Sequence, residues 1–314
     1  MVEEKLWFET HNEIKLFVRK WKPDTPPRAA VNIIHGMGEH GGRYAGIAAF
    51  LCGAGIEVWC ADQRGHGKTA DVAVNSEANG GLPGHCADKG AITKVLLDIN
   101  KINEKMKSAY PALPLFLLGH SWGSFMAQNY IESSRTNLAG CILSGTRGPD
   151  RTWLSGALAL IRVVTALYGV RHRSFFVNKL VFGSYNKSFA PAKTHFDWLS
   201  RDAREAAFFA EDPLCGALPS AGFFRDMLIL LKQVHRSRNL DKIRRTLPVY
   251  MFSGSKDPVG GMGENVTALA EKYKKIRISD LELVLYPDAR HECLHEINRE
   301  EVMHNLLTWL EKHI

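Results

Sequence analysis

The sequence predicts an α/β fold in which a mostly parallel sheet is covered by helices on both faces and interrupted by one largely helical insertion. Short apolar runs alternate with longer amphipathic segments along most of the 314 residues, as in a parallel sheet with helical crossovers. The composition, 45% hydrophobic and 23% charged, is that of an ordinary globular protein. Residues 145–246 contain no convincing core strand, and a stretch of that length is seldom without structure of its own.

The elements follow in order along the chain. Residues 5–21 alternate apolar and polar side chains, as an antiparallel hairpin does. Apolar runs predict six buried parallel strands, at 29–34, 56–60, 114–118, 138–144, 248–253 and 281–286. Helical periodicity links them at 43–53, 89–108, 122–134, 262–275 and 296–312. We therefore expect a core built from residues 1–147 and 236–314, with residues 148–235 as the insertion.

The cysteines and the N-terminus predict a cytoplasmic protein. The six cysteines lie far apart without a C-x-x-C pair, which favours free thiols in a reducing compartment. The charged start, MVEEK, lacks the apolar region of a signal peptide. No feature of the sequence indicates an oligomeric state.

Ser121 is the predicted nucleophile. The strand at 114–118 runs directly into the G-x-S-x-G motif of residues 119–123, and an amphipathic helix follows. Such a turn strains the serine backbone, so only small residues fit two places before and two places after it. The serine would stand at the carboxyl end of a central strand, where open α/β sheets bind ligands. This context disfavours the alternative, a glycine-rich turn with a capping serine.

Two backbone N–H groups are candidates for an oxyanion hole, which stabilises negative charge on a substrate carbonyl. One belongs to Trp122, directly after the nucleophile, and the other to Met37, in the loop after the strand 29–34. Loss of one such donor typically costs about 3–4 kcal/mol of transition-state stabilisation. The alternative for residues 35–42 is a flexible turn without a catalytic role.

A serine nucleophile needs a base and an acid, and this architecture places them on loops after later strands, the acid first. Asp257 follows the strand 248–253, and His291 follows the strand 281–286. We predict that His291 takes the proton of Ser121 and that Asp257 fixes the imidazole tautomer. Asp288 is a weaker candidate because it shares a loop with the histidine. This mechanism requires no metal and no organic cofactor.

The other histidines near the motifs are weaker candidates for the base. The geometry of the turn is expected to point His120 away from the nucleophile. His35 and His66 lie on other loops, and His295 is expected to begin the last helix.

Five segments resemble, in the same order, the monoacylglycerol lipase and lysophospholipase branch of the α/β-hydrolase superfamily, also labelled serine aminopeptidase-like. They are HGMGEHGGRY (35–44), DQRGHGKT (62–69), GHSWGS (119–124), GSKDPVG (254–260) and ARHE (289–292). The resemblance implies the α/β-hydrolase fold, supports the assigned triad and amide donors, and implies that the insertion is a cap or lid. Gly41 stands where the pattern usually has Ser. Trp122 stands where lipases of this branch often have Met, which narrows the space beside the nucleophile.

Residues 153–170 predict an amphipathic cap helix. Arg162 near the middle of this stretch, together with Gly156 and Gly169, disfavours a membrane span. The apolar side, near Trp153, Leu158 and Ile161, is the candidate substrate-binding surface, with simple packing onto the core as the alternative. The substrate hypothesis is a single-chain lipid ester, a monoacylglycerol or a lysophospholipid, hydrolysed through an acyl-enzyme.

The net charge of +7 lies in the first half of the insertion. Between residues 151 and 196 there is no acidic residue, and outside this interval 33 basic residues balance 33 acidic ones. The basic residues in the interval are Arg151, Arg162, Arg171, Arg173, Lys179, Lys187 and Lys193. A basic, apolar cap suits peripheral contact with a lipid surface. Solvated surface charge is the alternative, and no motif indicates nucleic-acid binding.

Three other functions remain open at this stage. The same core is compatible with a general carboxylesterase or lactonase, or with a proline iminopeptidase-type peptidase. A peptidase needs acidic cap residues to hold the substrate ammonium. Residues 151–196 contain none, and Glu205, Glu211 and Asp212 lie beyond them. The non-enzyme alternative is a ligand-binding receptor on the same fold.

Overall fold

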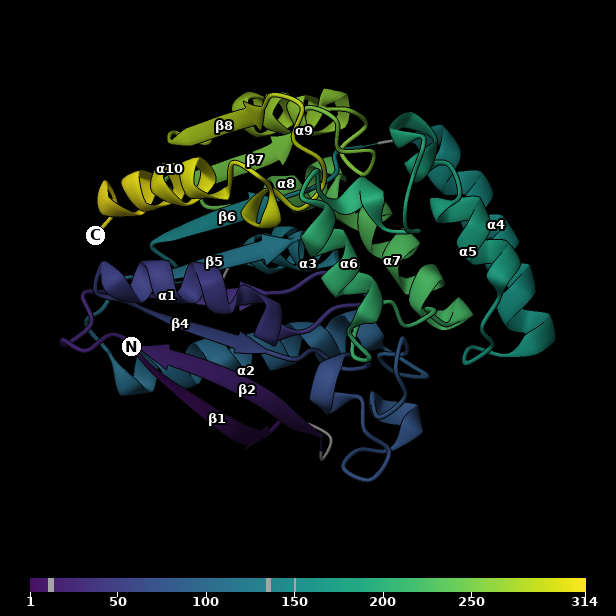
Figure 1. Ribbon diagram of the computed structural model, residues 1–314, viewed down its shortest axis with the longest axis horizontal. Coiled ribbons are helices and arrows are strands. Elements are labelled where there is room, and N and C mark those ends of the chain that lie inside the picture. The colour runs from purple at the N-terminus through teal and green to yellow at the C-terminus, as the bar shows by residue number, and fades with distance from the viewer. Residues whose placement is uncertain (11–13, 134–136, 150) are drawn as a thin grey trace.

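The computed structural model describes residues 1–10, 14–133, 137–149 and 151–314, without the side chains of 151–153. Its strands are β1 (Val2–Glu9), β2 (Lys15–Lys22), β3 (Ala29–Ile34), β4 (Ile56–Ala61), β5 (Leu115–His120), β6 (Gly140–Ser144), β7 (Val249–Gly254) and β8 (Leu281–Tyr286). They form one sheet in the order β1-β2-β4-β3-β5-β6-β7-β8 (Figure 1). β2 is antiparallel to β1 and to β4, and the other neighbouring pairs are parallel. The predicted mostly parallel sheet is confirmed.

Helices cover both faces of the sheet because successive strand residues point to opposite sides. In β3, Val31 and Ile33 contribute to the apolar layer under α1 (Ala45–Gly53) and α10 (Arg299–Glu311). Ala30 and Ile34 of the same strand contribute to the opposite layer. That layer lies under α2 (Ala91–Ala109), α3 (Trp122–Ile131) and α9 (Glu264–Lys275). All five predicted crossover helices are present.

The interval between β6 and β7 is helical, as predicted. It contains α4 (Arg151–Tyr168), α5 (Phe175–Phe182), α6 (Ala203–Glu211), α7 (Ala221–Val234) and α8 (Ser237–Leu240). Figure 1 shows α4 to α7 beyond the carboxyl ends of the parallel strands, with α4 and α5 at the outer end. We call residues 148–235 the cap. None of the described helices combines the length and apolar character needed to cross a membrane.

The cap is attached to the core through the loop that follows β4. Arg171 binds both carboxylate oxygens of Asp88, at 2.8 and 2.7 Å, and its Nη1 lies 2.9 Å from Glu77. Arg173 donates to the carbonyl of Pro83. Two of the seven basic residues between positions 151 and 196 therefore anchor the cap to the loop after β4.

Two details near the C-terminal strands complete the fold. His295 ends a short 3-10 helix, Cys293–His295, and α10 begins only at Arg299, so the expectation that His295 begins the last helix is wrong. All six cysteines are free thiols, and five of them are buried.

Candidate active site

Ser121 is the single residue between β5 and α3. Its backbone has φ 51° and ψ −120°, which lies outside the regions that L-residues ordinarily occupy. A Cβ on Gly119 would collide with the backbone of Gly123, and a Cβ on Gly123 would collide with the carbonyl of Ile34. The small residues on either side of the serine are therefore a steric requirement of this turn.

His291 and Asp257 form a buried pair on the loops after β8 and β7. The Nδ1 atom of His291 lies 2.9 Å from Oδ1 of Asp257, and the two residues are 1% and 0% exposed. Oδ1 of Asp257 also accepts the N–H of Val259 at 2.8 Å, and Oδ2 accepts the hydroxyl of Ser253 at 2.9 Å. With three donors fixing the carboxylate, Nδ1 of His291 is the protonated nitrogen and Nε2 keeps its lone pair.

The charges of this pair stabilise each other against the effect of burial. Burial by itself favours the neutral forms, but the Asp257 carboxylate raises the pKa of His291 above its ordinary value. In the same way, His291 holds the pKa of Asp257 below its ordinary value despite complete burial. The pair is therefore suited to hold a proton on the imidazole when one is delivered to Nε2.

The alternative acid does not contact His291. Asp288 is exposed, and its backbone N–H faces the hydroxyl of Ser255 at 2.8 Å. His120 differs from expectation, because it lines the cavity at Ser121 and its ring centroid lies 4.8 Å from that of His291. Burial, followed by the proximity of His291, lowers the pKa of His120 to about 4, so this neighbour stays neutral.

A buried carboxylate holds the loop that carries Met37. Oε1 of Glu39 accepts the N–H of Gly36 at 2.5 Å and the hydroxyl of Tyr44 at 2.9 Å. Within the described part of the chain, the N–H groups of Met37 and Trp122 have no acceptor. Both of the amides predicted to form an oxyanion hole thus remain able to donate to a ligand.

Arg43 links this loop to the loop of His291. Its guanidinium contacts Oε2 of Glu39 at 2.7 Å and binds both oxygens of Glu292 at 2.6 Å. Burial opposes ionisation of both acids, but Arg43 holds the pKa of each carboxyl below its ordinary value. Sequence reasoning missed these three residues, although all of them lie within the segments that carry the family resemblance.

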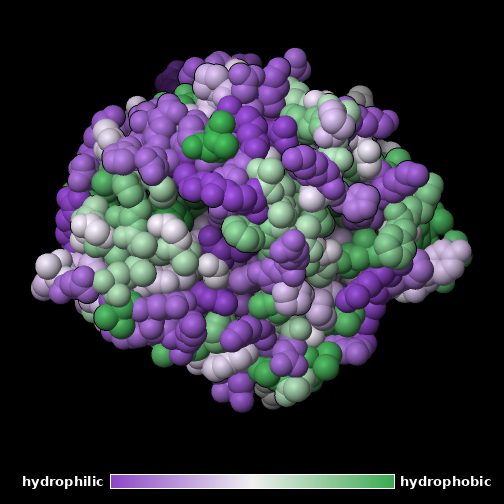
Figure 2. Space-filling model, viewed as in Figure 1, coloured by the Kyte–Doolittle hydropathy of each residue, from purple (hydrophilic) through white to green (hydrophobic). Residues whose placement is uncertain are grey.

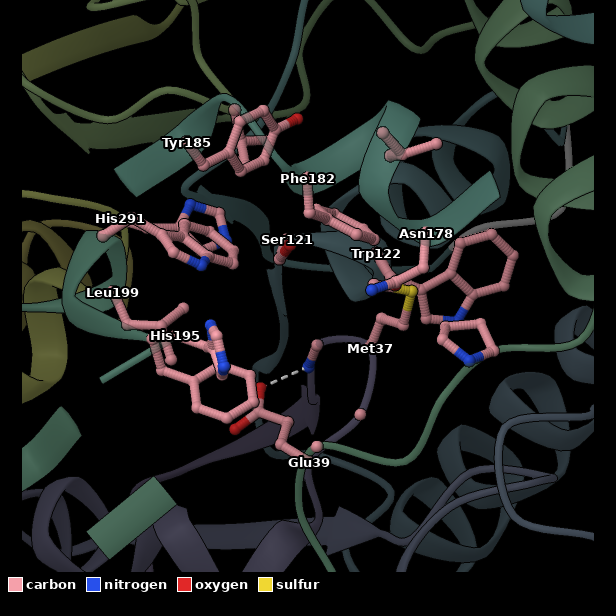
Figure 3. Close-up of a pocket in the computed structure, with 18 of the residues that line it drawn as sticks. Met37, Glu39, Ser121, Trp122, Asn178, Phe182, Tyr185, His195, Leu199 and His291 are labelled. Carbon is pink, nitrogen blue, oxygen red and sulfur yellow. Dashed lines mark hydrogen bonds between the residues drawn. The ribbon is translucent and has the colours of Figure 1, made fainter. Parts of the chain in front are cut away.

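Ser121 and His291 open into one cavity of about 630 Å³ between the core and the cap (Figure 3). Figure 3 shows Met37 and Trp122 on one side of Ser121 and His291 on the other. Apolar side chains from α3, α5, α6 and α7 contribute to the wall, among them Phe125, Val181, Phe182, Phe209, Met227 and Leu231. Trp122 is 2% exposed and fixed by a 3.1 Å hydrogen bond from its indole N–H to Gln63.

The substrate-binding surface predicted on the first cap helix is not part of this wall. Leu158 and Ile161 are 5% and 1% exposed and pack in the core on the side of α7, so neither lines the cavity. The side chain of Trp153 lies outside the described residues. The apolar face of α4 packs against α7, whereas residues of α5 line the cavity.

One group of side chains has metal-binding residue types. The ligand atoms of His40, Asp212 and Cys215 lie within 4.8 Å of one another, the one such trio among the described residues. However, Nδ1 of His40 accepts the N–H of Gly42 at 3.1 Å, so its proton is on Nε2, 2.9 Å from Asp212. This histidine presents no lone pair to a cation, and its hydrogen bond to Asp212 links the core to the cap.

Comparisons with known proteins agree with this geometry. A solved carboxyl esterase from Bacillus coagulans, in complex with glycerol, superposes with a TM-score of 0.89 at 26% identity over 99% of both chains. A monoacylglycerol lipase from Mycolicibacterium smegmatis is 27% identical over 307 residues, which cover 96% of this chain and 94% of the relative. The monoglyceride lipase of Homo sapiens is 28% identical over 304 residues, 95% of this chain and 87% of the relative.

A strained serine between a central parallel strand and the helix that follows is the architecture of the α/β-hydrolases. The family described as serine aminopeptidase, S33, matches residues 25–298. The chain belongs to this family, and its relatives place it on the monoacylglycerol lipase branch. The predicted fold, family resemblance and class of carboxylic ester hydrolase are confirmed.

Proposed function

We propose that this hydrolase cleaves esters through an acyl-enzyme on Ser121, with His291 as the base and Asp257 as its partner. The observation that carries the proposal is the buried Asp257–His291 pair in the same cavity as the strained serine. Because Asp257 accepts a hydrogen bond from the protonated Nδ1 of His291, the lone pair of Nε2 is available to the serine hydroxyl. Ser121→Ala, His291→Ala and Asp257→Asn are each expected to reduce ester hydrolysis by orders of magnitude.

The proposed reaction has two halves. Ser121 Oγ attacks the ester carbonyl while its proton passes to Nε2 of His291, and that proton then leaves on the departing alcohol. Water attacks the acyl-serine, gives a proton to the same nitrogen, and the acid is released as Oγ regains its proton. In both halves, the N–H groups of Met37 and Trp122 would donate to the carbonyl oxygen as it becomes negative.

The proposed substrate is a single-chain lipid ester, a monoacylglycerol or a lysophospholipid. A cavity of about 630 Å³ with a mainly apolar wall suits one acyl chain. Relatives at 27% and 28% identity are named monoacylglycerol and monoglyceride lipases, and the esterase from Bacillus coagulans was solved with glycerol. Glycerol is the alcohol that hydrolysis of a monoacylglycerol releases.

A general carboxylesterase or lactonase is the second candidate, because it would use the same site on shorter esters. A peptidase receives less support from the acidic residues. Of the described residues that line the cavity, Glu39 and Glu292 are the acids, and both are paired with Arg43. Asp212 of the cap is engaged by His40. These contacts leave no carboxylate in the described wall for a substrate ammonium.

Chain-length dependence distinguishes these functions. The purified protein is expected to hydrolyse monoacylglycerols or lysophospholipids of long acyl chains with a higher kcat/KM than p-nitrophenyl acetate, and not to cleave aminoacyl amides. A preference for short esters would replace the lipid proposal by the carboxylesterase one. A Ser121 that a fluorophosphonate probe fails to label would refute the enzyme mechanism and favour the receptor.

We also propose that residues 148–235 form the cap domain of a cytoplasmic enzyme, and that this cap contacts lipid surfaces peripherally. Phe175, Phe176 and Leu167 are 81%, 67% and 70% exposed on α5 and α4. Figure 2 shows hydrophobic residues at the outer end of the molecule where these helices lie. Each Lys or Arg near an anionic membrane contributes about 1 kcal/mol of attraction. Binding to anionic vesicles should therefore weaken as salt rises, and salt-independent binding would contradict an electrostatic contact.

A further inference from the structure

The loop of His291 is hydrogen-bonded along its length to a short strip of the cap, residues 197–200. The N–H of His291 faces the carbonyl of Trp198 at 3.4 Å, and the N–H of Glu292 donates to the carbonyl of Leu199 at 2.7 Å. The guanidinium of Arg290 donates to the carbonyls of Asp197 and Ser200. Figure 3 shows Leu199 close to His291 at the edge of the cavity. The cap strip therefore sets the position of the loop that carries the proposed base.

Within this strip, the indole of Trp198 packs on the imidazole of His291. The two ring centroids are 5.1 Å apart and the planes are inclined by 34°. The indole is held from the cap side by Phe182, at 6.2 Å with planes inclined by 14°, and by Tyr185, at 5.0 Å and 72°. Its backbone N–H donates to Asn186 at 2.8 Å. These contacts hold Trp198 within the cap, in addition to its contacts with His291.

This inference rests on the proposed function of His291. We propose that Trp198 is a positioning residue for His291: its indole holds the imidazole ring between Asp257 and Ser121 and stabilises the cation that His291 becomes during the reaction. An indole is the aromatic ring that attracts a cation most strongly, and desolvation strengthens that attraction. His291 is 1% exposed, so little water competes for the charge.

The other ring against His291 has a different effect. His120 lies at a centroid distance of 4.8 Å and hydrogen-bonds through Nδ1 to Ser144 at 3.1 Å. An imidazole that stays neutral offers weaker attraction to a cation than an indole does. The charged groups around His291 are Asp257, and beyond it Glu292 and Glu39, which share the guanidinium of Arg43. Trp198 is therefore the uncharged neighbour whose removal should change the imidazolium most.

The test uses p-nitrophenyl acetate, whose acyl group is too short to need the cap side of the cavity. Trp198→Leu removes the aromatic ring but keeps an apolar side chain against His291. We expect kcat for acetate to fall about tenfold, within the range of one desolvated cation–π contact. We also expect the acid limb of kcat/KM to move to lower pH by about half a unit, because the imidazolium loses a stabilising contact. Trp198→Phe should retain most of the rate, and its acid limb of kcat/KM should lie between those of the wild type and Trp198→Leu.

Phe189→Leu is the matched control. Phe189 lies in the cap outside the strip 197–200 and packs on the guanidinium of Arg290 at 4.2 Å, beside the loop of His291 but not on its ring. Its replacement should leave the acetate rate and the acid limb unchanged. Active-site titration with a fluorophosphonate and thermal melting normalise each rate to folded protein. If Trp198→Leu does not fold, Trp198→Met takes its place with the same expected shifts.

Two results would overturn the proposal. In the first, Trp198→Leu hydrolyses p-nitrophenyl acetate with the kcat and the acid limb of the wild type and loses activity only on p-nitrophenyl laurate. Trp198 would then only line the cavity and would not position His291. An equal change in Phe189→Leu would assign the effect to the packing of the cap on the loop of His291 in general, and not to the indole of Trp198. The failure of the proposed function is seen separately, because acetate hydrolysis would then persist in Ser121→Ala and His291→Ala.

Discussion

Replacing Glu132 by glutamine is expected to stabilise the protein at neutral and alkaline pH. Glu132 follows α3 and is 4% exposed, and neither of its carboxylate oxygens has a hydrogen-bond partner in the described structure. Burial raises its pKa from 4.5 to about 9, and Lys242 offsets only part of this effect. At pH 7 the folded protein therefore holds a neutral acid, whereas the unfolded chain holds a carboxylate.

The free-energy cost follows from this difference in protonation. Between about pH 4.5 and pH 9 the folded state binds one more proton than the unfolded state, so the free energy of unfolding falls as pH rises. The slope is about 1.4 kcal/mol per pH unit, which gives a cost of about 3 kcal/mol at pH 7. Glutamine has nearly the same shape and does not ionise. Glu132→Gln should therefore gain about 3 kcal/mol at pH 7 and nothing at pH 4.

Urea unfolding of both proteins at pH 4, 7 and 9 measures this prediction. Glu104→Gln is the matched control, because Glu104 is exposed on α2 and accepts a hydrogen bond from Asn100 that glutamine can keep. The control should follow the wild-type pH dependence. Parallel pH dependences of wild type and Glu132→Gln would refute the reasoning, because they would mean that Glu132 ionises equally in the folded and unfolded states.

Three further predictions concern the site. Asp257→Asn should fold normally but lower kcat for any ester by about 10⁴-fold, because asparagine no longer holds His291 in the productive tautomer; a loss below tenfold would contradict that role. Because the pKa of His291 is raised above 6.5 and its neutral form is the base, kcat/KM should fall as pH decreases, with the midpoint above 6.5. A pH–rate profile with its midpoint below 6.5 would contradict the pairing. Arg43→Met leaves Glu39 and Glu292 buried without their cation and should cost about 3–5 kcal/mol in urea unfolding, whereas a cost under 1 kcal/mol would mean that water solvates them.

The positions of the predicted site residues could be derived from the sequence because the sheet topology orders them. Ser121, Asp257 and His291 each follow a strand that the apolar runs marked correctly, and parallel strands bring their carboxyl ends to one edge. The two glycines around the serine carried a steric signal that the structure reproduces. No relation between distant side chains was needed to place these three residues.

The contacts that support the site required such relations. Glu39, Arg43 and Glu292 appear in the sequence as charged residues of loops, which are usually solvated. Arg43 and Glu292 are 249 positions apart, and only the sheet order brings them within 2.6 Å. The error on Leu158 and Ile161 has a similar cause. An apolar helix face shows that something covers it, but periodicity does not distinguish a neighbouring helix from a cavity.

The attachments of the cap bear on the proposed contact with a lipid surface. Arg171 fixes the cap to the loop after β4, and the strip 197–200 fixes it to the loop of His291. Between these two attachments lies α5, which contributes Val181 to the cavity wall from its buried side. Phe175, at the start of α5, lines the cavity and is also 81% exposed. A lipid surface that contacts Phe175 would therefore contact the wall of the cavity, so interfacial binding and entry of the acyl chain would involve the same helix.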